Sequence, residues 1–176
     1  RPASVGELPR GDLDVAGGSL GAIAATAAAD GTIGRFRYAI TAETHLTDGH
    51  DIVPERMATH AHNEDGAESL TLTGVFDVDL TESFALDLLV RHREARADFD
   101  TFVFPPPSFN EQRVDDADLE IAQNDLSVGR LGASWSPGEA LSLRATAGAV
   151  QQDRAERDGG LTTSTFDGER RFADLT

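Results

Sequence analysis

Three stretches of the chain alternate between apolar and polar residues, one position at a time. They cover residues 35–47, 69–80 and 84–98. In the first stretch Phe36 and Ile40 share one parity with other apolar residues, and charged or polar residues occupy the other parity. Successive side chains of a β-strand point to opposite faces. A period of two therefore predicts long strands with one apolar and one polar face.

Weaker alternation predicts further strands at residues 12–16, 121–135 and 141–149, and another is expected to begin at 171–176. The Ala-rich stretch 20–29 would by composition allow a helix, but its flanking glycines, Thr26 and the neighbouring strands favour a strand. Within 121–135, Leu126 and Val128 have one parity, whereas Leu131 and Trp135 have the other. Such a slip in phase predicts a β-bulge near Gly129.

The connections between these strands fall into two length classes. Short turns are expected at 30–34, 81–83 and 136–139, and long polar loops at 48–68, 99–120 and 153–170. All short turns then lie at one end of the sheet, which is typical of outer-membrane β-barrels. We therefore expect an all-β fold, an antiparallel up-and-down meander of about seven to eight long strands that forms an open, curved segment of a transmembrane barrel.

Large aromatic residues cluster near the expected short turns. Phe36, Tyr38, Phe84 and Trp135 all lie within a few residues of one. This placement resembles half of the aromatic belt that marks a membrane interface. The alternative is that these side chains form the core of a β-sandwich.

Composition narrows the classes of partner. The chain has 176 residues, a length typical of one domain, and a formal net charge of −16. Nucleic acid is excluded as a partner because phosphate contacts need clustered cations. Cysteine is absent, so strand pairing rather than disulfide bonds must stabilise the fold.

Several short stretches carry a resemblance to a known family. They are residues 31–39, 47–49, 80–86, 90–92 and 97–100. In their order and spacing the chain resembles the N-terminal part of the barrel of a TonB-dependent outer-membrane receptor, of the siderophore or cobalamin type. The resemblance covers most of the chain from about Gly11 onward.

The resemblance implies a function as well as a fold. Such receptors are barrels of about 22 strands with a plugged lumen. They take up metal chelates, siderophore-iron or cobalamin, with energy from the protein TonB. Residues 1–10 would then be the arm from a missing plug domain, and residues 11–176 part of the barrel. The expected location is the bacterial outer membrane, and the expected partners are outer-membrane lipid, a metal chelate, and TonB through a missing N-terminal segment.

An acidic stretch is a candidate calcium site. Asp98, Asp100, Asp115, Asp116 and Asp118 follow one another in the second long loop. Ca²⁺ takes six to eight hard oxygen ligands, which clustered carboxylates supply. Some cobalamin-type receptors order their loops with calcium, so the resemblance implies the same cofactor here. The alternative is a solvated, mutually repelling loop.

Two further pairs of residues are candidates for ligand contact. His60 and His62 lie in the first long loop, where imidazole groups suit a transition metal or an iron chelate. Arg91 and Arg93 fall on the polar face of their strand, where they can line a lumen and meet an anionic siderophore. The alternatives are an exposed polar loop for the histidines and a structural ionic ladder for the arginines.

No enzyme is expected, because the chain has no Gly-rich phosphate loop, Gly-x-Ser-x-Gly elbow or His-Glu-x-x-His motif. Two other classes stay open beside the receptor. One is a soluble secreted β-sandwich, a binding or adhesion module with acidic calcium loops. The other is a small outer-membrane barrel of about eight strands that closes on itself. Sandwich strands are usually shorter than those expected here.

Overall fold

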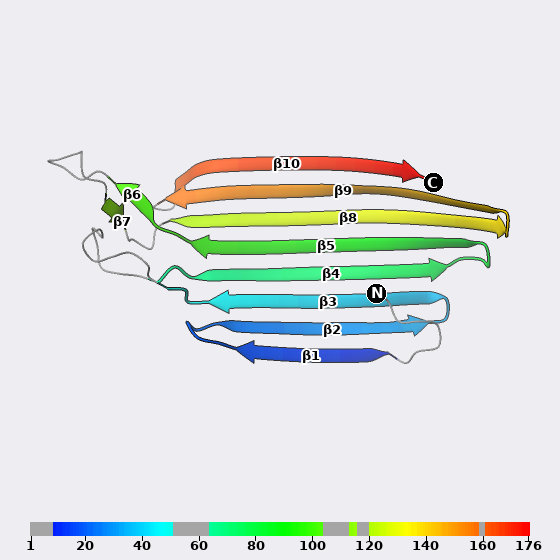
Figure 1. Cartoon of the computed structure of the whole chain (residues 1–176), viewed down its shortest axis with the longest axis horizontal. Helices are drawn as coiled ribbons and strands as arrows, with labels where there is room; N and C mark the ends of the chain where they lie inside the picture. Colours follow the sequence, from blue (N-terminus) through cyan, green and yellow to red (C-terminus); the bar gives the residue numbers. More distant parts are fainter. Residues whose placement is uncertain (1–8, 51–63, 104–112, 116–119, 159–160) are drawn as a thin grey trace.

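The chain forms one open antiparallel β-sheet of eight strands in the computed structural model (Figure 1). The strand order is β1-β2-β3-β4-β5-β8-β9-β10, so neighbours in the sheet follow one another along the sequence. The short strands β6 and β7 pair with each other in the connection between β5 and β8. The all-β, up-and-down meander predicted from the sequence is confirmed.

The structure describes residues 9–50, 64–103, 113–115, 120–158 and 161–176. Its strands are β1 (Arg10–Gly17), β2 (Ile23–Ile33), β3 (Phe36–Thr47), β4 (Ala67–Asp79), β5 (Phe84–Asp98), β6 (Thr101–Val103), β7 (Arg113–Asp115), β8 (Ile121–Gly138), β9 (Leu141–Asp158) and β10 (Leu161–Leu175). The arm expected at residues 1–10 falls mostly outside the described residues, and Arg10 already belongs to β1.

The strand register places the expected apolar residues on a common face. Phe36 lies opposite Val78, which in turn lies opposite Leu86. Tyr38, Phe76 and Leu88 form the next row in the same way. We call this side of the sheet the apolar face; it carries Phe36, Ile40, Leu72, Phe76, Leu86 and Leu88. The opposite side, the polar face, carries Thr41, Thr71, Thr73, Arg91 and Arg93.

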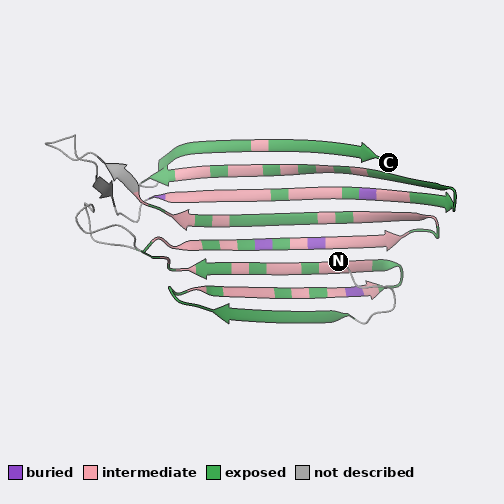
Figure 2. Ribbon diagram, viewed as in Figure 1, coloured by how far each residue is buried: buried purple, intermediate pink, exposed green. Residues whose placement is uncertain are grey.

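No second layer of described strands covers either face of the sheet. Among the described residues no large side chain is fully buried. Leu70 and Leu72 on the apolar face are 42% and 46% exposed, whereas Thr71 between them on the polar face is 7% exposed. Side chains crowd on the inside of a curve, so this difference indicates a sheet curved around its polar face. Figure 2 shows that the edge strands β1 and β10 are exposed along almost their whole length.

The two ends of the sheet differ in their connections. At one end, short turns join β2 to β3, β4 to β5 and β8 to β9, as predicted. The first of them uses Gly34 at φ 59°, a conformation that glycine adopts without strain. At the other end, the connections 48–66 and 99–120 are long. The prediction that all short connections lie at one end is wrong, because residues 18–22 join β1 to β2 and only two residues separate β9 from β10 at the end with the long connections.

The long loop predicted at 153–170 is wrong. β9 continues to Asp158 and β10 starts at Leu161, so only two residues separate them. The register runs from the Leu161–Asp158 pair to the Leu175–Ala145 pair, with one irregularity between Thr162 and Ser164. The stretch is mostly polar, which predicts a loop, but a strand whose two faces both meet water does not need apolar residues at alternate positions.

The bulge predicted near Gly129 is also wrong. Gly129 pairs with Val90 and with Ala149, and the register is continuous on both sides of it. The irregularity in β8 lies between Trp135 and Gly138 instead. Pro137 lies there and has no N–H to give to the strand ladder. The turn expected at 30–34 is shorter than predicted, since β2 extends to Ile33.

Candidate functional site

A hollow of about 410 Å³ lies on the polar face near the end of the sheet with the long connections. Its floor is made of small side chains. Ala67, Ala97 and Ala122 lie opposite one another on β4, β5 and β8, and Ala95 lies in the next row. We call this the polar-face hollow; its polar groups on this face come from His45, Ser69, Arg93, Asn124, Gln152 and Arg154. Glu68, Arg96 and Gln123, which form a row of the apolar face, also line it.

The polar groups of this hollow are partly fixed by one another. Gln152 Nε2 donates a 2.8 Å hydrogen bond to Asn124 Oδ1 across β8 and β9. One guanidinium nitrogen of Arg154 lies 2.6 Å from a carboxylate oxygen of Glu156. Arg93 has no hydrogen bond or ion pair to any residue that the structure describes. The hollow therefore offers preoriented amides and unused guanidinium donors.

The one acidic residue that lines the hollow belongs to the other side of the sheet. Glu68 lies opposite Leu46 on β3 and opposite Arg96 on β5, a row of the apolar face. Successive side chains alternate along a strand, so the carboxylate of Glu68 points away from the polar face. Within the described residues no carboxylate neutralises Arg93 in the hollow.

Ion pairs tie the polar face together nearer the short turns. Asp87 accepts hydrogen bonds of 2.9 Å from both Arg130 and Arg144, and its side chain is only 13% exposed. Arg37 donates two hydrogen bonds to Asp79, at 2.5 and 3.2 Å. These pairs link β3 to β4 and β5 to β8 and β9. Their cations are already engaged, which suits a structural role.

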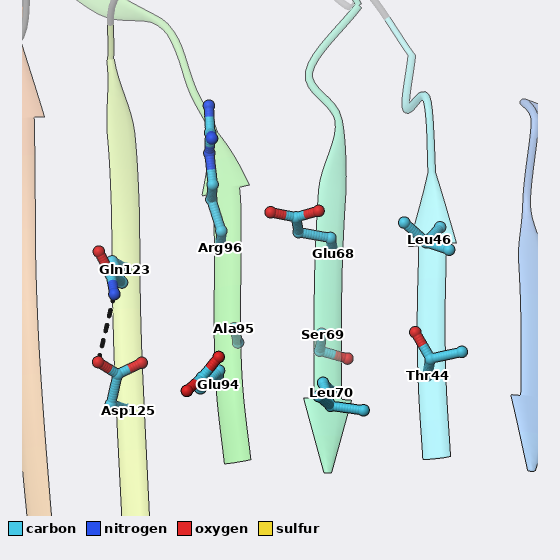
Figure 3. Close-up of a pocket in the computed structure, with 10 residues that line it drawn as sticks. All are labelled: Thr44, Leu46, Glu68, Ser69, Leu70, Glu94, Ala95, Arg96, Gln123 and Asp125. Carbon is cyan, nitrogen blue, oxygen red and sulfur yellow. Dashed lines mark hydrogen bonds between the residues drawn. The ribbon is translucent and has the colours of Figure 1, made fainter. Parts of the chain in front are cut away.

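A second hollow, of about 330 Å³, lies on the opposite side of the same strands (Figure 3). It is lined by Glu68, Glu94, Arg96 and Asp125, where the apolar face turns polar. Gln123 donates a 3.2 Å hydrogen bond to one oxygen of Asp125, shown dashed in Figure 3. This hollow is acidic, in contrast to the polar-face hollow.

The acidic wall of this second hollow continues across the sheet. Glu94 lies opposite Asp125, which lies opposite Asp153, which lies opposite Asp167. Like charges directly opposite each other destabilise a sheet. Within the described residues, however, no group of three or more His, Asp or Glu side chains is arranged to hold a metal ion.

The residues predicted from the sequence are only partly placed. Arg91 and Arg93 lie on the polar face of β5, as their parity predicts. Asp98 ends β5, where its N–H donates to the carbonyl of Gly66 at 2.9 Å. Its carboxylate lies 3.4 Å from Arg96. Asp100 follows β5, and Asp115 ends β7.

The other predicted site residues, His60, His62, Asp116 and Asp118, lie outside the described residues. The calcium loop and the histidine pair therefore remain predictions.

Sequence reasoning missed His45, Asn124, Gln152 and Arg154. The parity of each residue within its strand predicts its face. It does not predict which residues of distant strands lie side by side. That depends on the register of β3, β4, β5, β8 and β9, which turn and loop lengths set.

Comparisons of the chain with protein-family models, with curated proteins and with solved structures found no match. No helix in the described part of the chain is long and apolar enough to cross a membrane.

Proposed function

We propose that this chain forms part of the wall of a TonB-dependent outer-membrane receptor that takes up metal chelates, and that it is not an enzyme. The observation that carries the proposal is the exposed apolar face of a single-layer sheet. Each of the eight strands contributes at least one large apolar side chain that is exposed. An apolar surface of this extent marks contact with lipid or with another protein.

We call the part of the apolar face that carries large apolar residues the apolar band. Its limit toward the long connections supports lipid as the medium that covers the apolar face. The last large apolar residue is Leu46 on β3, and its partner on β4 is already Glu68. On β4 the last one is Leu70, and its partner on β5 is Glu94. The limit therefore crosses the hydrogen-bonded rows diagonally. The strands of membrane barrels are tilted by about 35–45°, so a flat lipid boundary must cross their rows in this way.

Aromatic residues at the other limit of the band support the same proposal. Phe84 and Trp135 lie opposite each other beside the short turns, on the apolar face. The ring of Phe36 stacks on Tyr38 and on Phe76, with centroid distances of 6.2 and 6.1 Å. Membrane proteins concentrate aromatic rings at the interface between lipid and water.

The two alternatives fit the described residues less well. A β-sandwich needs two sheets packed face to face, and the described strands give one large sheet and one small hairpin. A closed barrel needs its first and last strands paired, but β1 pairs with β2 and β10 with β9 among the described residues. An open sheet therefore agrees best with part of a receptor barrel. The metal chelate as ligand and TonB as partner are proposed from the resemblance of the sequence to this family.

The single tryptophan of the chain makes the proposal testable. The full chain is refolded into phosphatidylcholine vesicles whose lipids carry bromine at shallow or deep positions of the acyl chains. Bromine quenches tryptophan fluorescence at short range. We expect strong quenching of Trp135, largest for the shallow bromines, because its ring lies at the interface end of the apolar band.

A matched variant moves the tryptophan to the other face. Trp135→Phe combined with Leu89→Trp places the indole on the polar face, since Leu89 lies opposite Val75 and Arg130. Quenching in this variant should be weak. Equal quenching of both proteins, or none in either, would contradict the proposal that lipid covers the apolar face.

A further inference from the structure

We infer that the polar-face hollow binds the oxyanionic side of a metal chelate, so that the ligand is a chelate with free carboxylate groups. The inference rests on the proposed function and adds the chemical class of the ligand. It starts from a contrast in charge. The whole chain carries a net charge of −16, yet Arg93, Arg154 and His45 line this hollow from the polar face. Glu68 and Arg96, which also line it, lie opposite each other in a row of the apolar face.

Arginines gather on the polar face of one half of the sheet. On the polar face of β5, β8, β9 and β10 they outnumber the acids within the described residues. The arginines are Arg91, Arg93, Arg130, Arg144, Arg154 and Arg170, and the acids are Asp87, Glu156, Asp158 and Asp174. On β1 to β4 the same face is mainly acidic, with Asp12, Asp14, Asp30, Glu43, Asp77 and Asp79. The positive half of the polar face is the half that contains most of the hollow.

Part of this positive charge is not used inside the protein. Asp87 is held by Arg130 and Arg144, so those two guanidinium groups are engaged. Arg91 and Arg93 make no ion pair with any described residue. A concave, positively charged surface attracts anions from solution. Arg93 is exposed, and its guanidinium donors are available to an anion from solution.

The shape of the hollow fits a small chelate. Its volume of about 410 Å³ is within the range of small-molecule sites, roughly 300–1,000 Å³. The alanine floor lets a ligand approach the strands closely. Guanidinium groups bind carboxylates through two parallel hydrogen bonds, and Arg154 keeps donors beyond the one on Glu156. The paired amides of Asn124 and Gln152 add directional polar contacts.

The test compares arginines on the two faces of the sheet. Arg93→Gln on β5 and Arg154→Gln on β9 remove charge from the hollow. Arg157→Gln on β9 and Arg171→Gln on β10 remove the same charge from the opposite face, because Arg157 lies opposite Ile121 and Arg171 lies opposite Ala149. The full chain is refolded in detergent, and binding of ferric citrate is measured by equilibrium dialysis.

We expect each hollow variant to bind ferric citrate about tenfold more weakly, as for loss of a charge-assisted contact. The two opposite-face variants should stay within about twofold of the parent, because exposed distant charges are screened. A neutral iron trihydroxamate should bind no differently to any of the four. Equal loss in all four variants, or no loss in the hollow variants, overturns the inference.

A second comparison separates a chelate site from a site for any small anion. Inorganic phosphate is added as competitor. Competition by phosphate together with direct binding of ferric citrate supports the inference, whereas binding of phosphate alone overturns it. The quenching of Trp135 by brominated lipid is measured on the same variants. If Trp135 is quenched and ferric citrate does not bind, this inference fails and the proposed receptor wall does not.

Discussion

At the scale of single residues, several glycines inside the strands lie beneath aromatic rings. A Cβ atom at Gly31 would lie 2.8 Å from the hydroxyl of Tyr38, and one at Gly74 would lie 2.8 Å from the ring of Phe76. Glycine in a strand loses packing because it has no side chain. A ring laid over it restores apolar contact, a device that also pins the strand register.

Gly132 has a different role, since it makes room for a charge. It lies opposite Asp87, and a Cβ atom there would overlap the Asp87 carboxylate that Arg130 and Arg144 share. We expect Gly132→Ala to displace this half-buried carboxylate and to lower the free energy of unfolding by about 1–3 kcal/mol. Urea unfolding in detergent, followed by tryptophan fluorescence, measures the change.

Gly129 on the same strand is the matched control. A Cβ atom there meets no atom within 4 Å. Gly129→Ala should therefore be neutral or stabilise by about 0.4–1 kcal/mol, because alanine restricts the unfolded chain more than glycine does. A loss of stability in Gly129→Ala equal to that in Gly132→Ala would show that the Asp87 contact is not the cause.

At the scale of elements, the sequence predicts the strands inside the apolar band best. The expected strand 84–98 coincides with β5, and the expected strand 35–47 differs from β3 by one residue. These strands have one wet and one apolar face, so alternation marks them. β9 and β10 extend beyond the band, where both faces are mostly polar apart from Leu161 and Phe166, and alternation disappears. Gly159-Gly160 was the missed hairpin signal in the sequence.

The prediction of a bulge near Gly129 was wrong for a related reason. That prediction assumed that every apolar residue of β8 lies on the apolar face. Val128 instead lies on the polar face, opposite Val150, and Leu126 lies opposite Arg93 and Gln152. Apolar pairs between strands also stabilise the inner side of a sheet. Parity alone therefore cannot decide between a bulge and an inward-facing valine.

The candidate site was predictable in part. The face of Arg91 and Arg93 follows from parity within a single strand. The neighbours that make a hollow around Arg93 come from residues as distant as His45 and Arg154. Only the strand register brings them together, and a shift by one residue would move each to the other face.

The limit of the apolar band can be tested on β9, because the chain has no cysteine of its own. Ala145 and Asp153 lie on the same face of β9, one inside the band and one beyond it. In vesicles, we expect Asp153→Cys to react with a water-soluble maleimide at least about tenfold faster than Ala145→Cys, because lipid excludes water and the thiolate from the band.

Equal reaction rates of the two cysteine variants in vesicles would contradict this limit. The same two variants in urea provide the control, since unfolding should make their rates equal.

At the scale of the whole molecule, the sheet is open and one layer thick. The outer edges of β1 and β10 carry backbone groups that no described strand pairs with. Unpaired edges and a continuous apolar face both favour association. The net charge of −16 opposes association through repulsion between chains. Solubility therefore depends on which of the two effects is larger.

Without lipid or detergent, the attraction between apolar faces should exceed the repulsion between the charged chains. Burial of about 400 Å² of apolar surface contributes about 10 kcal/mol, whereas repulsion between exposed charges is screened over about 10 Å at 0.1 M salt. We expect the full chain to aggregate in plain buffer, faster as salt rises, and to stay dispersed in detergent. Sedimentation velocity measures both. A monodisperse monomer that melts cooperatively in plain buffer would contradict this, because such a protein must cover its apolar face itself.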